Sequence, residues 1–151
     1  MLAAAMTPSP NLIANLRAEL MRFAPFAQME PAHVERFVAD SMQCYFEPGE
    51  LLLSPSHGVA KHLLLIRRGS VGGRRGTDDA RAAFELEAGD LFPIGAAMAE
   101  RAVGTTYTAQ ADTFCLALPA ASMRTLARDS APFADFLNRR VQQLLDLARR
   151  A

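Results

Sequence analysis

Hydrophobic residues recur at helical spacing in the first part of the chain. Ser9 followed by Pro10 suits an N-cap and a first helical position, and the pattern after this pair predicts a helix that ends near Pro25. The apolar positions of this helix are Leu12, Ile13, Leu16, Leu20 and Phe23. Pro31 introduces a second, shorter helix with an apolar face of its own.

Between residues 41 and 118 the pattern changes to short apolar or alternating runs separated by turn residues. Glycine, alone or after proline, interrupts the chain every several residues, as at Gly49 and Gly89. The runs cover residues 43–46, 51–53, 62–67, 70–74, 82–87, 105–109 and 113–118. Short strands at this spacing predict a sandwich, a jelly roll or a barrel.

The helical period returns after Pro119. It predicts one helix over residues 121–128 and another from Phe133 to the end of the chain. The apolar face of the last helix is wide enough to pack on the strands or to pair with a second copy of the chain. The residues expected in a homodimer contact are Phe133, Leu137, Val141, Leu144 and Ala148. This helix has no glycine cap or proline stop, so we expect that the chain belongs to a longer protein.

The length and the composition suit a single domain. Half of the 151 residues are hydrophobic, which is enough for one core but short for two. We expect an N-terminal helical segment (1–40), a β-roll (41–118) and C-terminal helices (119–151) within that domain.

The charges are balanced, with 16 lysine and arginine residues against 16 aspartate and glutamate residues. Because no overall positive field attracts nucleic acid or an anionic membrane, we expect this chain alone to bind neither. No apolar run approaches the roughly 18 residues of a membrane span, and no export signal opens the sequence. These features predict a cytoplasmic protein.

Candidate metal and catalytic residues are few. Cys44 and Cys115 each lie in an apolar, strand-like run, which predicts buried thiols rather than a disulfide or a metal site. His57 and His62 lack the His-x-His spacing that places two ligands on one face of a strand, so we expect no metal. The sequence contains no nucleophile elbow, Walker loop or dinucleotide-binding turn. We therefore expect no catalytic residues and no enzyme activity.

A series of turn and strand motifs between Phe23 and Phe136 resembles the successive landmarks of the cyclic-nucleotide-binding domain. The motifs are Phe26, Phe46-Glu-Pro-Gly-Glu50, Leu63-Leu-Leu-Ile66 with Gly69-Ser-Val71, Leu86-Glu-Ala-Gly-Asp90, Phe92, Ala109, Asp112-Thr-Phe-Cys115 and Leu118-Pro119. The resemblance implies a mainly β fold, a double-stranded β-helix or jelly-roll barrel with flanking helices. It also implies a domain that senses a ligand and does not catalyse a reaction.

The resemblance further implies a phosphate-binding cassette, a loop and short helix after a strand that begins near Leu91. In this family, backbone N–H groups and an arginine bind the cyclic phosphate, and a glutamate binds the ribose. Here Ile94 or Gly95 stands where that glutamate would fall. Val103 takes the place of the arginine, which leaves Arg101 as the candidate cation or as an ordinary surface arginine. The implied ligand contacts are Phe92, Pro93, Ile94, Gly95, Ala96, Ala97, Arg101, Thr105 and Thr106.

Four segments also resemble one type of this domain found in bacterial multidomain proteins: Phe92-Pro-Ile-Gly-Ala96, Arg101-Ala-Val103, Tyr107-Thr-Ala109 and Asp112-Thr-Phe-Cys115. There the domain precedes a pair of CBS domains and a predicted nucleotidyltransferase. The resemblance implies a regulatory module that takes a nucleotide-like or other small anionic ligand and has no resident cofactor. Two alternatives remain open. One is a module that binds nothing and serves dimerisation or docking, and the other is the sensory half of a catabolite-activator-like transcription regulator.

Overall fold

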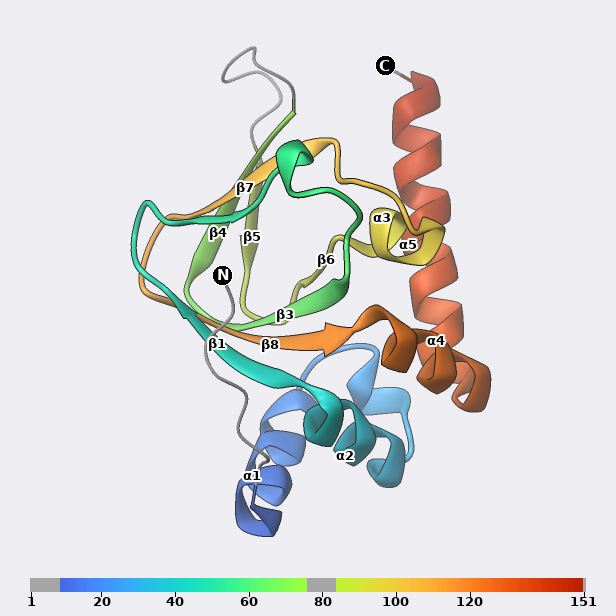
Figure 1. Ribbon diagram of the computed structural model, residues 1–151. Helices are drawn as coiled ribbons and strands as arrows, with labels where there is room; N and C mark the ends of the chain where they lie inside the picture. The colour runs from blue at the N-terminus through green and yellow to red at the C-terminus, as the bar shows by residue number, and fades with distance from the viewer. Residues whose placement is uncertain (1–8, 76–83, 151) are drawn as a thin grey trace. The chain divides into compact units, whose positions relative to one another are not determined.

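The computed structural model describes residues 9–75 and 84–150, with side chains described as far as residue 146 (Figure 1). The described residues form two compact units. We call residues 41–120 the roll unit, and residues 9–40 with 121–150 the helical unit. The division of the chain into three segments of one domain stays a prediction.

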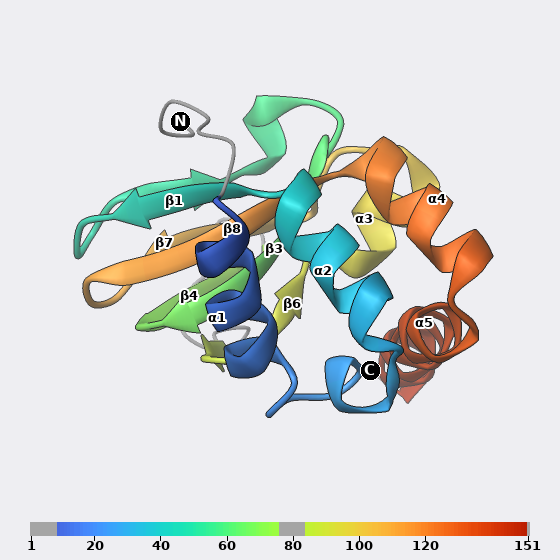
Figure 2. The same ribbon diagram turned by 90° about the horizontal axis from the view of Figure 1, so that it is seen from below.

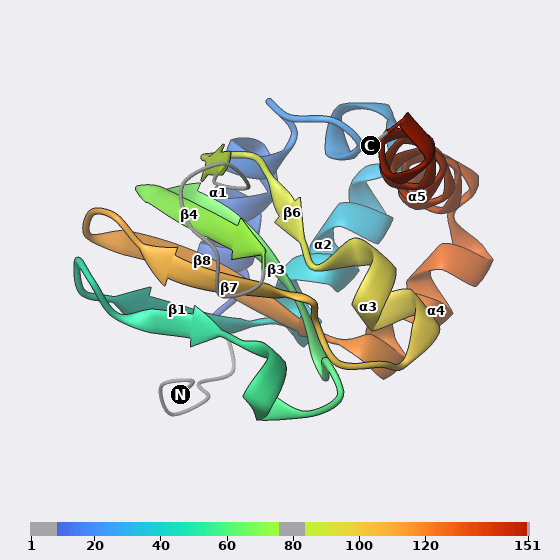
Figure 3. The same ribbon diagram turned by 90° about the horizontal axis from the view of Figure 1, so that it is seen from above.

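The roll unit contains two four-stranded antiparallel sheets, which face each other across its interior (Figures 1 and 3). The first sheet has the order β1-β8-β3-β6, with bounds Met42–Phe46, Thr113–Pro119, His62–Arg68 and Leu91–Phe92. The second has the order β2-β7-β4-β5, with bounds Leu51–Leu53, Thr105–Ala109, Ser70–Arg75 and Phe84–Glu87. This topology confirms the predicted jelly roll.

Alternation along the strands builds the core of the roll unit. Successive side chains of a strand point to opposite faces, so every second residue of each inner strand meets the facing sheet. The resulting cluster contains Cys44, Phe46, Leu52, Ala60, Leu64, Ile66, Val71, Phe92, Ala96, Val103, Tyr107, Ala109, Cys115 and Ala117. Both cysteine side chains are therefore buried, as expected from the sequence.

The predicted strand runs and the observed strands agree closely. Residues 82 and 83 of the predicted run 82–87 lie outside the described residues, and the other runs match strands within a residue or two. The hydrophobic pattern gave no run for β6, and only the family resemblance implied a strand that begins near Leu91. This strand has two residues, which is too short for a period of two to be recognised.

The helical unit holds α1 (Pro10–Leu20), η1 (Phe26–Gln28), α2 (Pro31–Asp40), α4 (Ala120–Asp129) and α5 (Ala131–Arg150). Figure 2 shows α1 alongside α2, and an ion pair of 2.6 Å joins Arg17 to Glu35 between them. In the core of this unit the ring of Phe37 lies edge-on to two other rings, at 4.9 Å from Phe26 and 6.1 Å from Phe133. Aromatic pairs of this geometry stabilise a fold beyond their buried area.

The first helix ends earlier than the sequence pattern predicts. Ser9 caps it as expected, because its hydroxyl oxygen accepts a hydrogen bond from the Leu12 N–H at 3.2 Å. The helix nevertheless stops at Leu20 and does not reach Pro25. The Phe23 N–H donates a hydrogen bond of 2.9 Å to the carbonyl of Leu20. This bond spans three residues, as in a turn, and not the four of an α-helix. A proline disfavours the helical conformation of the residue that precedes it. The chain therefore leaves the helix before it reaches Pro25.

Candidate functional site

The predicted cassette forms a short helix, α3 (Ile94–Ala99), directly after β6 (Figure 3). The N–H groups in the first turn of any helix have no partner within that helix. The N-cap of α3 is Pro93, and no side chain caps this end of the helix. Glu100 ends α3 with φ of 54°, and its side chain is exposed. The first turn of α3 therefore carries backbone donors, whereas the nearest glutamate lies at the opposite end of the helix.

Arg101 lies beside the first turn of α3. Its Nη2 atom is 3.5 Å from the position that a Cβ atom of Gly95 would occupy. The Arg101 backbone is held from two sides, because its N–H donates to the carbonyl of Ala96 at 3.1 Å and its carbonyl accepts from the N–H of Ala60 at 3.0 Å. The exposed Arg101 side chain thus passes next to Gly95 in the first turn of α3, at a distance at which a methyl group would make only an ordinary van der Waals contact.

Val103 is a core residue of the roll unit. It is 6% exposed and belongs to the cluster between the two sheets. Ile94, one of the two positions that would hold the ribose-binding glutamate, is also buried. The position of the family's arginine is therefore occupied by an apolar core residue, and that of its glutamate by the buried Ile94 or by Gly95, which has no side chain.

Three aromatic side chains of the roll unit, Phe84, Phe92 and Tyr107, lie together, and we call them the aromatic cluster. Phe92 and Tyr107 are buried, whereas Phe84 is 39% exposed. The rings of Phe92 and Tyr107 lie 4.7 Å apart, and Phe84 meets Tyr107 edge-on at 6.3 Å. The ring of Phe84 also covers Gly73, where a Cβ atom would collide with it. Sequence reasoning included Phe92 but missed the other two residues.

Burial raises the pKa of the Tyr107 phenol, and two neighbours partly oppose this effect. These neighbours are a hydrogen bond with the Thr105 side chain and the charge of Arg75. Thr105 is buried on the inner face of β7, directly opposite Arg75 on β4. The ring of Tyr107, the hydroxyl of Thr105 and the guanidinium of Arg75 are therefore neighbours in the roll unit.

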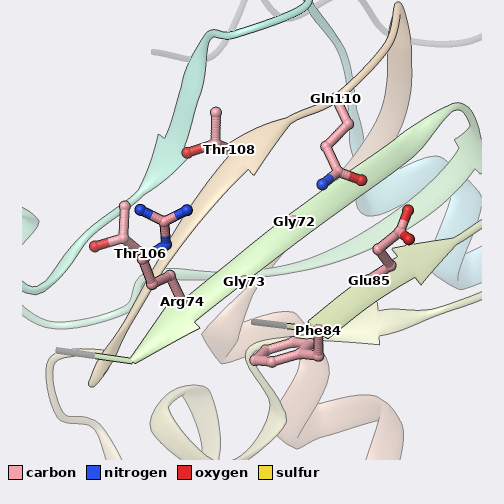
Figure 4. A pocket seen from close by; sticks show the side chains of 8 residues that line it. All are labelled: Gly72, Gly73, Arg74, Phe84, Glu85, Thr106, Thr108 and Gln110. Atoms are coloured by element: carbon pink, nitrogen blue, oxygen red, sulfur yellow. The ribbon is translucent and has the colours of Figure 1, made fainter. Parts of the chain in front are cut away.

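The structure separates the two threonines that the sequence placed in one site. Thr105 points to the interior, whereas Thr106 follows it on the strand and points to the outer face. On that outer face Thr106 lines an open depression of about 690 Å³ (Figure 4). The full lining is Gly72, Gly73, Arg74, Phe84, Glu85, Thr106, Thr108 and Gln110. This depression is a feature of the outer surface of β4, β5 and β7, distinct from the cassette at α3.

The two histidines weighed as metal ligands, His57 and His62, lie in different environments. His57 is exposed, and His62 is half-buried, where burial followed by the charge of Lys61 lowers the pKa of its imidazole. Within residues 9–75 and 84–146, no three or more His, Cys, Asp and Glu side chains gather into a group that would hold a metal ion.

Among the described helices, none combines the length and the apolar composition needed to cross a membrane.

No protein-family model matches the sequence, and no curated protein does. Among solved structures, the sensor domain of the transcriptional regulator DNR from Pseudomonas aeruginosa aligns with a TM-score of 0.76 at 13% identity. That alignment covers 91% of this chain and 93% of the DNR chain.

Two larger proteins contain a similar domain. The catabolite activator protein of Thermus thermophilus gives a TM-score of 0.64 at 22% identity, with 87% of this chain and 63% of that chain covered. The regulatory domain of Toxoplasma gondii PKA, crystallised with cAMP, gives 0.74 at 13% identity, with coverages of 87% and 50%. This chain thus spans only part of those two proteins. The chain has the fold of the cyclic-nucleotide-binding domains.

Proposed function

We propose that this chain is a regulatory sensor domain that binds a small anionic ligand, such as a nucleotide phosphate, between α3 and Arg101. The fold supports this proposal, because the structures it resembles are regulatory or sensor domains. The observation that carries it is the position of the Arg101 guanidinium over Gly95. On this proposal the domain is not an enzyme.

The charge and the donors at this place suit an anion. Among the described residues, no carboxylate forms an ion pair with Arg101, so its guanidinium can bind a phosphate directly. The first-turn N–H groups of α3 add backbone donors next to it. The two together reproduce the chemistry of the family's cassette, with the arginine supplied from two positions earlier in the sequence.

The rest of the ligand meets a different environment from that of a standard cassette. A ribose finds no glutamate in α3, and a base entering the roll unit meets the aromatic cluster. We therefore expect the anionic group to supply most of the affinity, with little discrimination between bases.

Replacement of Arg101 by alanine is expected to weaken binding of the anion at least about tenfold, because a charge-assisted hydrogen bond is lost. The measurement is calorimetric titration with cyclic AMP, cyclic GMP, AMP and inorganic phosphate. The matched control is Arg68→Ala, which removes an exposed arginine at the end of β3. Equal affinity of both variants, or no heat with any of the four ligands, would contradict the proposed site.

A second candidate function, dimerisation, is favoured by the surface of α5. Leu144 and Leu145 are exposed, and Val141 is half-buried. Of the residues expected in a homodimer contact, Phe133 and Leu137 are buried, and Ala148 lies beyond the described side chains. Of the expected contacts whose side chains are described, Val141 and Leu144 are therefore the two accessible for pairing, and the exposed Leu145 lies next to Leu144.

If α5 pairs with a second copy, Leu144→Glu is expected to raise the dimer dissociation constant at least about tenfold, because it places an unpaired charge in an apolar contact. Sedimentation velocity over a range of concentrations measures this. Gln142→Glu adds the same charge at another exposed position of α5 and is expected to leave the dimer intact. A wild-type chain that stays monomeric throughout the range would exclude this candidate.

Transmission of a ligand signal remains part of the proposal. We propose that α4 and α5 respond to the ligand and alter an attached effector, which requires that the ligand binds one arrangement of the helices more tightly. A pair of CBS domains with a nucleotidyltransferase, or a DNA-binding domain, are the effectors that the sequence resemblances imply. The cytoplasmic location also stays a prediction.

A further inference from the structure

The two cysteines of the chain lie directly opposite each other on neighbouring strands. Cys44 on β1 pairs with Cys115 on β8 in the antiparallel register. Both side chains belong to the core cluster of the roll unit, with exposures of 4% and 1%, so they point to the same face. Far apart in the sequence, they are the only cysteines among its 151 residues. We propose that Cys44 and Cys115 are a redox pair that forms an intramolecular disulfide between β1 and β8.

The register places the two residues within reach of such a bond. Directly opposed residues of an antiparallel pair have Cα atoms about 4.5 or 5.5 Å apart, and disulfides accept about 4.4 to 6.8 Å. Their Cβ atoms lie about 4.5 to 5.5 Å apart, whereas a disulfide needs about 3.5 to 4.5 Å. A local approach of the two strands by up to about 1 Å closes this difference. The hydrogen-bond ladder can stay in place.

β1 is able to make this approach because it is an edge strand. Its only partner in the sheet is β8, so it can move or open without breaking a second ladder. Burial, with a smaller effect of the nearby Cys44, raises the pKa of Cys115 to about 12. The thiols are therefore unreactive while the roll unit is closed. Oxidation proceeds through transient opening of β1, which makes the pair respond to sustained rather than brief oxidation.

A disulfide oxidant such as oxidised glutathione completes the reaction. After β1 opens, the thiolate of one cysteine attacks the oxidant, forms a mixed disulfide and releases one glutathione thiol. The thiolate of the second cysteine attacks the mixed disulfide and releases the other glutathione. The protein loses two electrons and two protons, and the oxidant becomes two molecules of reduced glutathione.

The bond would close a loop that contains residues 45–114, which is most of the roll unit. A crosslink over a loop of this length restricts the unfolded chain strongly. We expect the oxidised protein to unfold at a temperature about 10 °C higher than the reduced protein. Addition of dithiothreitol should restore the lower midpoint.

The experiment is incubation of the folded protein with oxidised glutathione, followed by denaturation, alkylation and intact mass measurement. The expected product is a monomer lighter by two hydrogens, with no alkylated cysteine and a raised thermal midpoint. Cys44→Ser and Cys115→Ser should each prevent both changes. The urea-unfolded chain, treated in the same way, establishes the oxidising conditions.

Two results would overturn the inference. One is that both thiols of the folded protein remain open to alkylation under conditions that fully oxidise the unfolded chain. The other is that oxidation yields only glutathione adducts or crosslinked dimers. Either result would show that the register brings the cysteines together as packing residues only. The inference does not depend on the proposed anion site.

Discussion

Replacement of Gly69 by alanine is expected to destabilise the protein by about 2–5 kcal/mol, the sum of a backbone and a packing penalty. Gly69 joins β3 to β4 with φ of 101°, a conformation that L side chains rarely adopt. A Cβ atom there would lie 2.6 Å from Oγ1 and 2.7 Å from Cα of Thr113, and would also collide with the carbonyl of Asp112. Two of these three atoms belong to the backbone and cannot rotate away.

The neighbours of Gly69 are also fixed by their own contacts. Thr113 is fully buried, and its Oγ1 atom lies 2.8 Å from the carbonyl oxygen of Ala111 and 3.1 Å from that of Ser70. Moving Thr113 aside to admit a methyl group would break these hydrogen bonds. The strain therefore cannot be relieved locally.

Gly49→Ala is the matched control for this prediction. Gly49 has φ of 88°, but no atom lies within 4 Å of its hypothetical Cβ. The control should carry only the backbone penalty of about 1–2 kcal/mol. Urea denaturation followed by circular dichroism measures both losses. Equal destabilisation by the two substitutions would show that the packing around Thr113 yields easily and that the collision is unimportant.

The fold was predictable from the sequence because its strands are marked at both ends. Turn residues such as Gly49, Gly69 and Gly89, each with positive φ, separate the apolar runs and leave few alternatives for the strand boundaries. The pairing of the strands was not readable from these local signals. It followed from the family resemblance, and the register Cys44 with Cys115 emerged only from the structure.

The candidate site was only partly predictable. The helix after Phe92 was expected, but the position of Arg101 depends on its contact with Ala60, far away in the sequence. The separation of Thr105 from Thr106 could have been read from the strand period, since neighbouring residues of a strand point to opposite faces. Which face of β7 is the inner one required the pairing of the sheets.

Phe84 gave no functional signal in the sequence, and Tyr107 entered only as part of a segment that resembles the family, not as a site residue. An aromatic residue in a strand has good β propensity and is usually a packing residue. Only the pairing of β5 with β4 and of β4 with β7 brings these two rings together, the buried ring of Tyr107 and the exposed ring of Phe84.

Val103→Arg is expected to destabilise the ligand-free protein by about 3–5 kcal/mol, because it buries a charge without a partner. The wild-type side chain lies between the sheets, where the core cluster surrounds it. Val59→Arg is the control, since Val59 is 50% exposed and its side chain can be replaced without burial of the guanidinium. Chemical denaturation of the two variants measures the difference.

The same variant distinguishes a remodelled site from a standard cassette. Arginine at position 103 restores the cation that the family places there. If the interior of the roll unit can hold a cyclic nucleotide, the bound ligand neutralises this charge, and the Val103→Arg variant recovers stability. We expect no recovery with cyclic AMP, because the buried rings of Phe92 and Tyr107 occupy that interior. If cyclic AMP restores the stability of Val103→Arg to that of Val59→Arg, the aromatic cluster yields to a nucleotide. In that case binding does not centre on Arg101, and the proposed anion site is wrong.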